Sequence, residues 1–197
     1  ATDVTQSTYG IYERMRSCFV NTTCNVFYWG EVRVGTYMWG SSIVNLAHDN
    51  DMIGVESSTM NGTNASTNWS ALYTTIDQAN AVLKYAPTIN MSDKERGFAI
   101  GQASFARAYC YFWAARLWGD VPLNLVPIES VSQPECYPVR APKAEVYAQI
   151  GKDIETAIEN AEYLGGDCYF ATKTAVNLLK AKLDSLKEIG ISADSAV

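Results

Sequence analysis

The chain has 197 residues, of which 48% are hydrophobic and 18% are charged, so it is long enough for one domain with a proper core and too apolar for a disordered protein. Its formal net charge of -6, without any cluster of Lys and Arg, argues against a nucleic-acid partner, because binding phosphates requires grouped cations. The sequence has no run approaching the roughly 20 apolar residues that span a membrane, and residues 1–10 lack the layout of a signal peptide.

A helix is the first predicted element, over residues 5–19, because apolar and aromatic side chains recur there at helical spacing. They are Tyr9, Tyr12, Met15 and Phe19. Residues 25–37 place β-branched and aromatic side chains between glycines, which is typical of a short strand or an extended loop. Residues 58–70 are small, polar and turn-forming, which predicts a surface loop that leads into the next helix.

The next two predicted helices cover residues 67–85 and 92–118 and form a hairpin. The first starts at Asn and Ser capping residues and ends before Pro87. The second starts with a capping box made by Ser92 and Glu95. Its apolar stripe is so wide that we expect this helix to be buried on more than one side, at the centre of the domain.

The central helix is predicted to end abruptly, and this is the clearest helix end in the sequence. Gly119 stops the helix, and Pro122 prevents it from resuming. We expect Asp120 to mark the helix terminus and Arg107 to find a buried polar partner. The aromatic residues on these two helices are expected to pack in the core rather than bind a ligand, and they are Trp69, Tyr109, Tyr111, Trp113 and Trp118.

A second hairpin is predicted over residues 142–164 and 172–189, after a proline-rich crossover at residues 121–142. Gly165 and Gly166 are expected to stop its first helix. The inward side chains are predicted to be Val146, Ile150, Ile154, Ala157, Ile158 and Ala161 in the first helix and Ala175, Leu178, Leu179, Ala181 and Leu183 in the second.

These elements predict an all-α fold of tetratricopeptide-like helical hairpins with long loops and little or no strand. A single helix pair cannot bury its apolar face alone, so successive pairs stack. We assign residues 1–197 to one helical domain. Its parts are helix and loops at 1–68, a first hairpin at 69–118, a proline-rich crossover at 119–141 and a second hairpin at 142–189.

Residue chemistry offers little support for catalysis or metal binding. The five cysteines contain no CxxC pair, and buried thiols are favoured over a disulfide framework, although Cys18 and Cys24 remain a possible pair. The only histidine, His48, lies beside Asp49 and Asp51 without the spacing of a calcium loop or a nucleophile motif. We therefore expect no catalytic residues, no metal and no cofactor, with carboxylate-based glycoside hydrolysis as a weaker alternative.

Aromatic side chains lie among polar ones between residues 28 and 68. A sugar ring presents apolar C–H faces and hydroxyl groups, so a glycan site combines flat aromatic platforms with amide, carboxylate and guanidinium groups. The predicted ligand-binding residues are Trp29, Arg33, Tyr37, Trp39, Asn64 and Asn68. Residue chemistry alone favours the interpretation that the two tryptophans belong to the core and the asparagines only form turns, so the ligand-binding assignment depends on a resemblance to a known family.

The central helix and its ending resemble the "RAYxYFxLxRxWGDVPL" signature of the SusD/RagB family, a family of surface glycan-binding lipoproteins of Bacteroidetes. The residues that carry this resemblance are Ala103, Arg107, Ala108, Tyr109, Tyr111, Phe112, Arg116, Leu117, Trp118, Gly119, Asp120, Val121, Pro122 and Leu123. Two flanking helices are also similar to family motifs, around residues 69–80 and 140–157. The resemblance covers residues 69–183, and the first 68 residues match only weakly.

The resemblance implies a non-catalytic, starch-binding type of protein that takes part in nutrient uptake. It would bind an oligosaccharide or polysaccharide and deliver it to a SusC-like TonB-dependent transporter. It also implies a surface-exposed lipoprotein of the outer membrane, held there only through a lipid anchor outside this chain. Glu31 and Arg33 are similar to the family's "ExRxD" stretch, but no Asp follows at Gly35 or Thr36.

Other interpretations remain open. Family members run to well over twice this length, so the chain is either an N-terminal portion or a short relative. A helical-repeat scaffold for protein–protein interaction, without a ligand of its own, is the main alternative. Glycosylation-type triplets would suit a secreted eukaryotic protein, but they cluster in an Asn/Ser/Thr-rich stretch where chance matches are easy. They begin at Asn21, Asn61, Asn64, Asn68 and Asn90.

Overall fold

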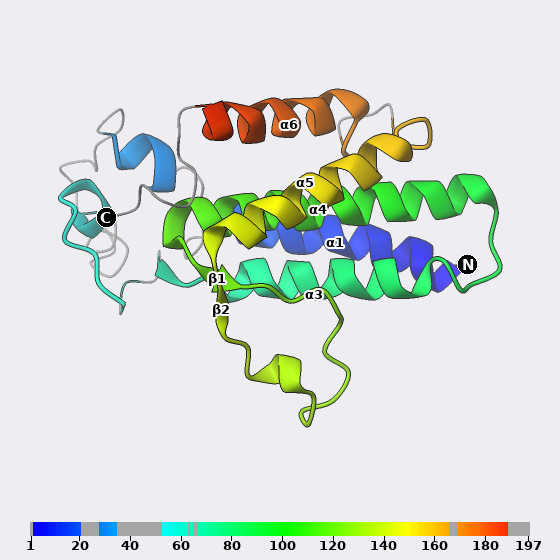
Figure 1. The fold of residues 1–197 in the computed structure, drawn as a ribbon, viewed down its shortest axis with the longest axis horizontal. Coiled ribbons are helices and arrows are strands. Elements are labelled where there is room, and N and C mark those ends of the chain that lie inside the picture. Colours follow the sequence, from blue (N-terminus) through cyan, green and yellow to red (C-terminus); the bar gives the residue numbers. More distant parts are fainter. Residues whose placement is uncertain are drawn as a thin grey trace. The chain divides into compact units, whose positions relative to one another are not determined.

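The computed structural model describes residues 2–20, 28–34, 53–62, 64, 67–165 and 169–188, and its regular structure is almost entirely helical (Figure 1). The long helices are α1 (Thr2–Val20), α3 (Ser70–Tyr85), α4 (Asp93–Trp118), α5 (Lys143–Glu159) and α6 (Lys173–Glu188). The shorter elements are the π-helical turn η1 (Tyr28–Val32), the 3₁₀ turn η3 (Pro134–Cys136) and the two-residue strands β1 (Val121–Pro122) and β2 (Arg140–Ala141). The all-α fold of tetratricopeptide-like hairpins with very little strand is therefore confirmed.

The chain divides into two compact units. The first, which we call the helical frame, comprises residues 1–13 and 72–197, and the second, the loop unit, comprises residues 14–71. The boundaries fall within α1 and close to the start of α3. The assignment of all residues to one domain with four parts stays a prediction.

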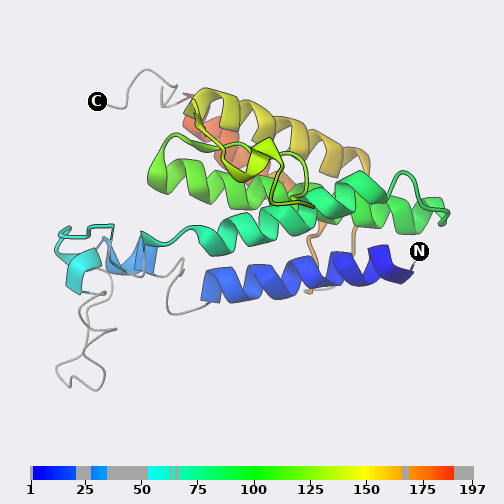
Figure 2. The same cartoon turned by 90° about the horizontal axis from the view of Figure 1, so that it is seen from below.

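Within the helical frame, α3 and α4 run in opposite directions, α5 packs along α4, and α6 packs on α5 (Figure 1). The first half of α1 lies beside α3 (Figure 2), where the side-chain amide of Gln78 donates a hydrogen bond of 2.6 Å to the hydroxyl of Ser7. The Tyr12 hydroxyl donates to Gln102 of α4 and accepts from the backbone N–H of Ala171, so α1 also joins α4 to the start of α6. Within the described ranges, every helix is too short or too polar to cross a lipid bilayer.

The central helix α4 is buried along most of its length, as its wide apolar stripe predicts. At its start, the Ser92 hydroxyl accepts from the N–H of Glu95 while the Glu95 carboxylate accepts from the N–H of Ser92, which is the predicted capping box. This pairing lowers the pKa of Glu95. At its end, Gly119 has a φ of 72°, a value that L side chains rarely adopt, and its N–H still donates to Ala115. Both predicted boundaries of α4 are confirmed.

The predicted end of α5 at residue 164 is wrong, because the helix stops at Glu159. The Asn160 side chain donates to the Thr156 carbonyl at 2.9 Å, and the chain then turns instead of continuing the helix. This turn places Tyr163 and Leu164 over two glycines of α4. A Cβ atom at Gly97 would lie 2.1 Å from the Tyr163 ring, and one at Gly101 would lie 2.8 Å from a Leu164 methyl group.

The inward face of α6 also differs from the prediction. Val176, Leu179 and Leu183 are buried, whereas Leu178 is 58% exposed and Ala181 is exposed. Neighbouring helical positions point about 100° apart, so Leu178 cannot share the face that Leu179 presents to α5. On α1, Tyr9 is 50% exposed, whereas Phe19 of the predicted stripe is buried, and the other buried positions are Val4, Thr8, Ile11 and Cys18.

The predicted strand or extended loop at residues 25–37 is wrong for the described part, residues 28–34. Tyr28–Val32 forms a π-helical turn, and the Val34 N–H donates to the Gly30 carbonyl at 3.1 Å. Of the cysteines, Cys18 and Cys110 are completely buried, as expected for side chains that act as small apolar residues. Cys24 and Cys168 lie outside the described residues.

Candidate functional site

All six predicted ligand-binding residues belong to the loop unit. The structure describes four of them, Trp29, Arg33, Asn64 and Asn68, and Tyr37 and Trp39 lie outside the described residues. His48, Asp49 and Asp51 lie outside them as well.

Trp29 lies in η1 and is partly buried. Its ring packs edge-on against Phe19 of α1, with the ring centroids 6.5 Å apart and the planes at 90°. This geometry is a favourable aromatic pair. Trp29 therefore combines a packing contact with remaining exposed surface.

Arg33 and Asn64 both contact the single helical turn at residues 53–56. The exposed Arg33 guanidinium donates from Nη1 to the Val55 carbonyl at 3.4 Å, next to the fully buried Val55 side chain. Asn64 packs its amide against Gly54, where an added Cβ would lie 3.1 Å from Nδ2. Arg33 and Asn64, both predicted ligand-binding residues, thus contact the same short turn, although they are far apart in sequence.

The two asparagines have local structural roles. The Asn64 side-chain oxygen accepts from the Asn61 N–H at 2.8 Å, which closes a tight turn in the loop before α3. The Asn68 side-chain oxygen accepts from the Ser70 N–H at 2.9 Å and caps the start of α3. Because Asn68 is exposed, its amide nitrogen faces solvent while its oxygen holds the helix.

A buried polar network lies in the helical frame, at the middle of the family-like signature. The Arg107 guanidinium donates to both carboxylate oxygens of Asp153, at 2.8 and 2.6 Å, and to the Asn80 side-chain oxygen at 2.8 Å. Gln149 donates to the same carboxylate at 2.8 Å. Arg107, Asp153 and Asn80 are all buried, so this network links α4 to α5 and α3. The expectation that Arg107 has a buried polar partner is confirmed.

We call residues 121–142, between α4 and α5, the crossover arm. Its start is held by three side chains of the first hairpin, of which Tyr111 and Asn80 are buried and Tyr73 is partly buried. The Tyr111 hydroxyl accepts from the Asn124 N–H at 2.7 Å and donates to the Asn124 carbonyl at 2.8 Å. The Asn80 amide donates to the carbonyls of Asn124 and Val126, and the Tyr73 hydroxyl donates to that of Pro122. Burial raises the pKa of both phenols, which keeps them protonated as donors.

The two ends of the crossover arm are tied together. The strands β1 and β2 pair in antiparallel fashion, with Val121 opposite Ala141. The Asp120 carbonyl accepts from Arg140 at 2.7 Å, and its carboxylate accepts from the Lys143 N–H at 2.8 Å. Asp120 thus marks the end of α4, as expected, and also supplies the side-chain cap for α5, which Pro142 cannot give.

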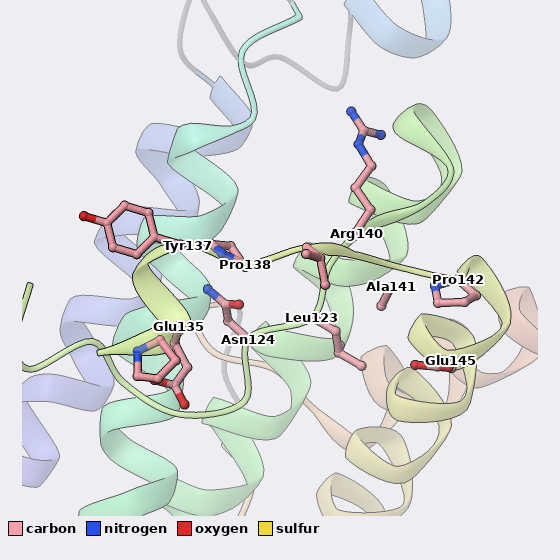
Figure 3. Close-up of a pocket in the computed structure, with 11 residues that line it drawn as sticks. Leu123, Asn124, Glu135, Tyr137, Pro138, Arg140, Ala141, Pro142 and Glu145 are labelled. Atoms are coloured by element: carbon pink, nitrogen blue, oxygen red, sulfur yellow. The ribbon is translucent and has the colours of Figure 1, made fainter. Parts of the chain in front are cut away.

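A pocket of about 520 Å³ opens at the base of the crossover arm (Figure 3). It is lined by Leu123 and Asn124 after β1, by Pro134, Glu135 and residues 137–142 of the arm, and by Glu145 in the first turn of α5. The arm also exposes large apolar side chains, which are Leu125, Val126, Ile128, Val131, Tyr137 and Val139. The sequence carries a signal for this feature, a tyrosine between two prolines in an ordered crossover, but it lies outside the predicted ligand-binding residues.

Comparison with known proteins gives consistent matches in sequence. A SusD-like family model, described as starch-binding and associating with the outer membrane, matches residues 18–176. SusD-like protein P38 of Formosa agariphila is 30% identical over 159 residues, which cover 80% of this chain and 30% of that protein. SusD-like protein P2 of the same organism is 31% identical over 91 residues, which cover 46% of this chain and 18% of that protein. The matched segments thus cover less than a third of the length of each of these curated relatives.

Solved structures show the same fold. A laminarin-binding SusD-like protein matches with a TM-score of 0.77 and 22% identity, over 98% of this chain and 41% of that one. A SusD superfamily protein from Bacteroides thetaiotaomicron matches with a TM-score of 0.78 and 20% identity, over 95% of this chain and 44% of that one. At these identities the likeness concerns the fold.

Proposed function

The chain belongs to the SusD-like family, and from this membership we propose that it binds a glycan at the cell surface without breaking any of the glycan's bonds. The observation that carries the proposal is the family match over residues 18–176, which includes the loop unit from Cys18 onward, the first helical hairpin, and the second hairpin as far as the first turn of α6. The name of a similar structure, a laminarin-binding protein, supports a polysaccharide ligand.

We place the glycan contacts in the loop unit, on Trp29, Arg33, Tyr37, Trp39, Asn64 and Asn68. The exposed part of the Trp29 ring offers a flat apolar face for a sugar ring. The exposed guanidinium of Arg33 and the free nitrogen of the Asn68 amide offer hydrogen-bond donors for hydroxyl groups. Binding by stacking and hydrogen bonds alone implies modest affinity.

The proposal also includes a partner protein and a cellular location. The bound glycan would be handed to a SusC-like TonB-dependent transporter, and the protein would be a surface-exposed lipoprotein of the outer membrane. The family description, which associates these proteins with the outer membrane, supports this location.

Affinity electrophoresis in gels containing starch or laminarin, followed by calorimetry with soluble oligosaccharides, tests the proposal. We expect binding by the whole chain and a loss of about tenfold or more in Trp29→Ala and Trp39→Ala, because aromatic anchors often carry more than 1 kcal/mol of binding energy. Tyr169→Ala, which removes an exposed ring of the helical frame, is the control and should bind normally. Unchanged binding in both tryptophan variants would remove the site assignment, and release of shorter sugars would show catalysis.

A helical-repeat scaffold for protein partners is the second candidate. The observation that favours it is the crossover arm, where Val131 and Val139 are 87% and 85% exposed. Exposed apolar side chains grouped on one segment are typical of a protein-binding surface. This candidate predicts no glycan binding by the unaltered chain and capture of a protein partner that is lost on Val139→Asp.

A further inference from the structure

We propose that the pocket at the base of the crossover arm is a second glycan site, built for an uncharged oligosaccharide. This inference rests on the proposed function, but it concerns residues of the helical frame that neither the sequence motifs nor the comparisons assign to a ligand. The pocket volume of about 520 Å³ lies within the range of small-molecule sites and is large enough for a few sugar rings.

The walls of the pocket are held in place before any ligand binds. Tyr111 fixes both backbone groups of Asn124, and Asp120 fixes the position of Arg140 and the start of α5. At the arm's far side, Glu129 pairs with Lys84 at 2.7 Å and also accepts from Tyr85. Pre-organised walls reduce the entropy cost of binding, which matters for ligands that bind through a few weak contacts.

Polar side chains in the pocket wall are available for a ligand. In the described part of the chain, no hydrogen bond engages the side-chain amide of Asn124 or the carboxylates of Glu135 and Glu145. In Figure 3, Asn124 and Leu123 lie between Tyr137 on one side and Glu145 on the other. An amide and two carboxylates that accept or donate hydrogen bonds match the vicinal hydroxyl groups of a sugar.

Tyr137 supplies the aromatic surface. It is 82% exposed, and its hydroxyl has no hydrogen-bond partner among the described residues. A ring this exposed contributes little to the core, so its free face can stack on the C–H face of a sugar. An exposed tyrosine at the mouth of a pocket with unpartnered polar groups is the combination that a glycan site requires.

The charges of the pocket select uncharged ligands. Glu135 and Glu145 bring two carboxylates to the lining, whereas the one guanidinium, on Arg140, already donates to the Asp120 carbonyl and points away from the other labelled side chains (Figure 3). An acidic sugar would meet like charges without a free cation to compensate. The same carboxylates disfavour a protein partner, because the cores of protein interfaces are depleted in Glu and Asp.

The test compares glycan binding by the whole chain and two pocket variants, Tyr137→Ala and Glu145→Gln. The probes are starch and laminarin as neutral glucans and polygalacturonate as an acidic one, in affinity gels and calorimetry. We expect neutral glucan binding to weaken about tenfold in Tyr137→Ala and several-fold in Glu145→Gln. Tyr169→Ala removes a ring that is similarly exposed, at 76%, but does not line the pocket, and it should bind normally.

Each outcome decides a separate point. Glucan binding that both pocket variants leave unchanged overturns the second site while the proposed function stands. Absence of glycan binding by the unaltered chain overturns both. Tighter binding of polygalacturonate than of the glucans contradicts the assignment to uncharged ligands. If Tyr137→Ala abolishes only an association with protein, the arm is a protein interface and the pocket assignment is wrong.

Discussion

The helical frame and the loop unit hold their backbones in different ways. In the frame, buried side chains bridge residues far apart in sequence, as Arg107 does with Asp153 and Tyr111 does with the crossover arm. Among the hydrogen bonds that join two described residues of the loop unit, most close short turns, such as that between Asn61 and Asn64. The comparison teaches that long-range buried polar contacts specify the frame, whereas local turn chemistry shapes the loops that carry the proposed site.

The family signature belongs to the frame. Arg107 links three helices, Tyr111 holds the crossover arm, Gly119 adopts a positive φ, and Asp120 caps the following helix. Each of these four residues therefore has a structural role that explains its identity. The signature therefore reports on the fold, and none of these four residues is among the proposed glycan contacts of the loop unit.

The largest loss of stability is expected for Arg107→Met, which tests whether long-range polar contacts specify the helical frame. It leaves the Asp153 carboxylate buried without its cation, which should lower the free energy of unfolding by about 3–5 kcal/mol. Urea denaturation followed by circular dichroism measures the change. Lys180→Met removes an exposed ion pair with Asp184 on the same frame and should cost less than about 1 kcal/mol.

A second variant keeps this test decisive if the single change prevents folding. Arg107→Met combined with Asp153→Leu removes both charges, so it should be more stable than Arg107→Met alone. If Arg107→Met costs no more than the surface control, long-range polar contacts do not specify the frame and the comparison fails.

Smaller changes in stability are expected for two glycine-to-alanine substitutions in the helical frame, and the two changes should have opposite signs. Gly97→Ala pushes a methyl group into the Tyr163 ring and should destabilise the protein by about 1–3 kcal/mol. Gly151→Ala, in the interior of α5 with no atom within 4 Å of the new Cβ, should stabilise it by about 0.5–1 kcal/mol. Thermal unfolding of both variants gives the signs, and stabilisation by both would refute the close packing of the turn after α5.

The smallest change in stability is expected in the loop unit, for substitutions of Asn68. Asn68→Ala removes the cap of α3 and should cost about 1 kcal/mol, whereas Asn68→Asp keeps an acceptor oxygen and should leave stability unchanged. Both variants remove the amide nitrogen proposed to contact a glycan. Calorimetry should therefore show weaker glycan binding in both, although only one is less stable. Normal binding by Asn68→Asp would assign Asn68 to capping alone.

Sequence signals that act over one turn of helix predicted the frame well. The capping box of Ser92 and Glu95 and the stop at Gly119 lie where the sequence placed them. The stop of α5 was missed because Asn160 bonds back to Thr156 and the following residues pack on α4, which depends on tertiary contacts. Helical periodicity likewise placed Leu178 on the buried face of α6, although that face is set by tertiary packing, mainly against α5.

The proposed site was harder to predict for a physical reason. The loops before α3 have no periodicity, so their residues could be selected only by chemical type and by the family resemblance. Trp29 illustrates the limit, because sequence cannot tell how a tryptophan divides its surface between a neighbour such as Phe19 and solvent. The partner of Arg107 was also invisible, since Asp153 lies 46 residues away.

The hydrogen bonds that Asp120 accepts from Arg140 and Lys143 affect how the crossover arm can vary in length and sequence. Because the base of the crossover arm is closed independently of its tip, residues between the two strands can be exchanged or lengthened without moving the start of α5. Loop-closure entropy grows slowly, so doubling the loop costs only about 0.6 kcal/mol. The arm is therefore a natural position for grafting, where new recognition loops can be installed on an unchanged helical scaffold.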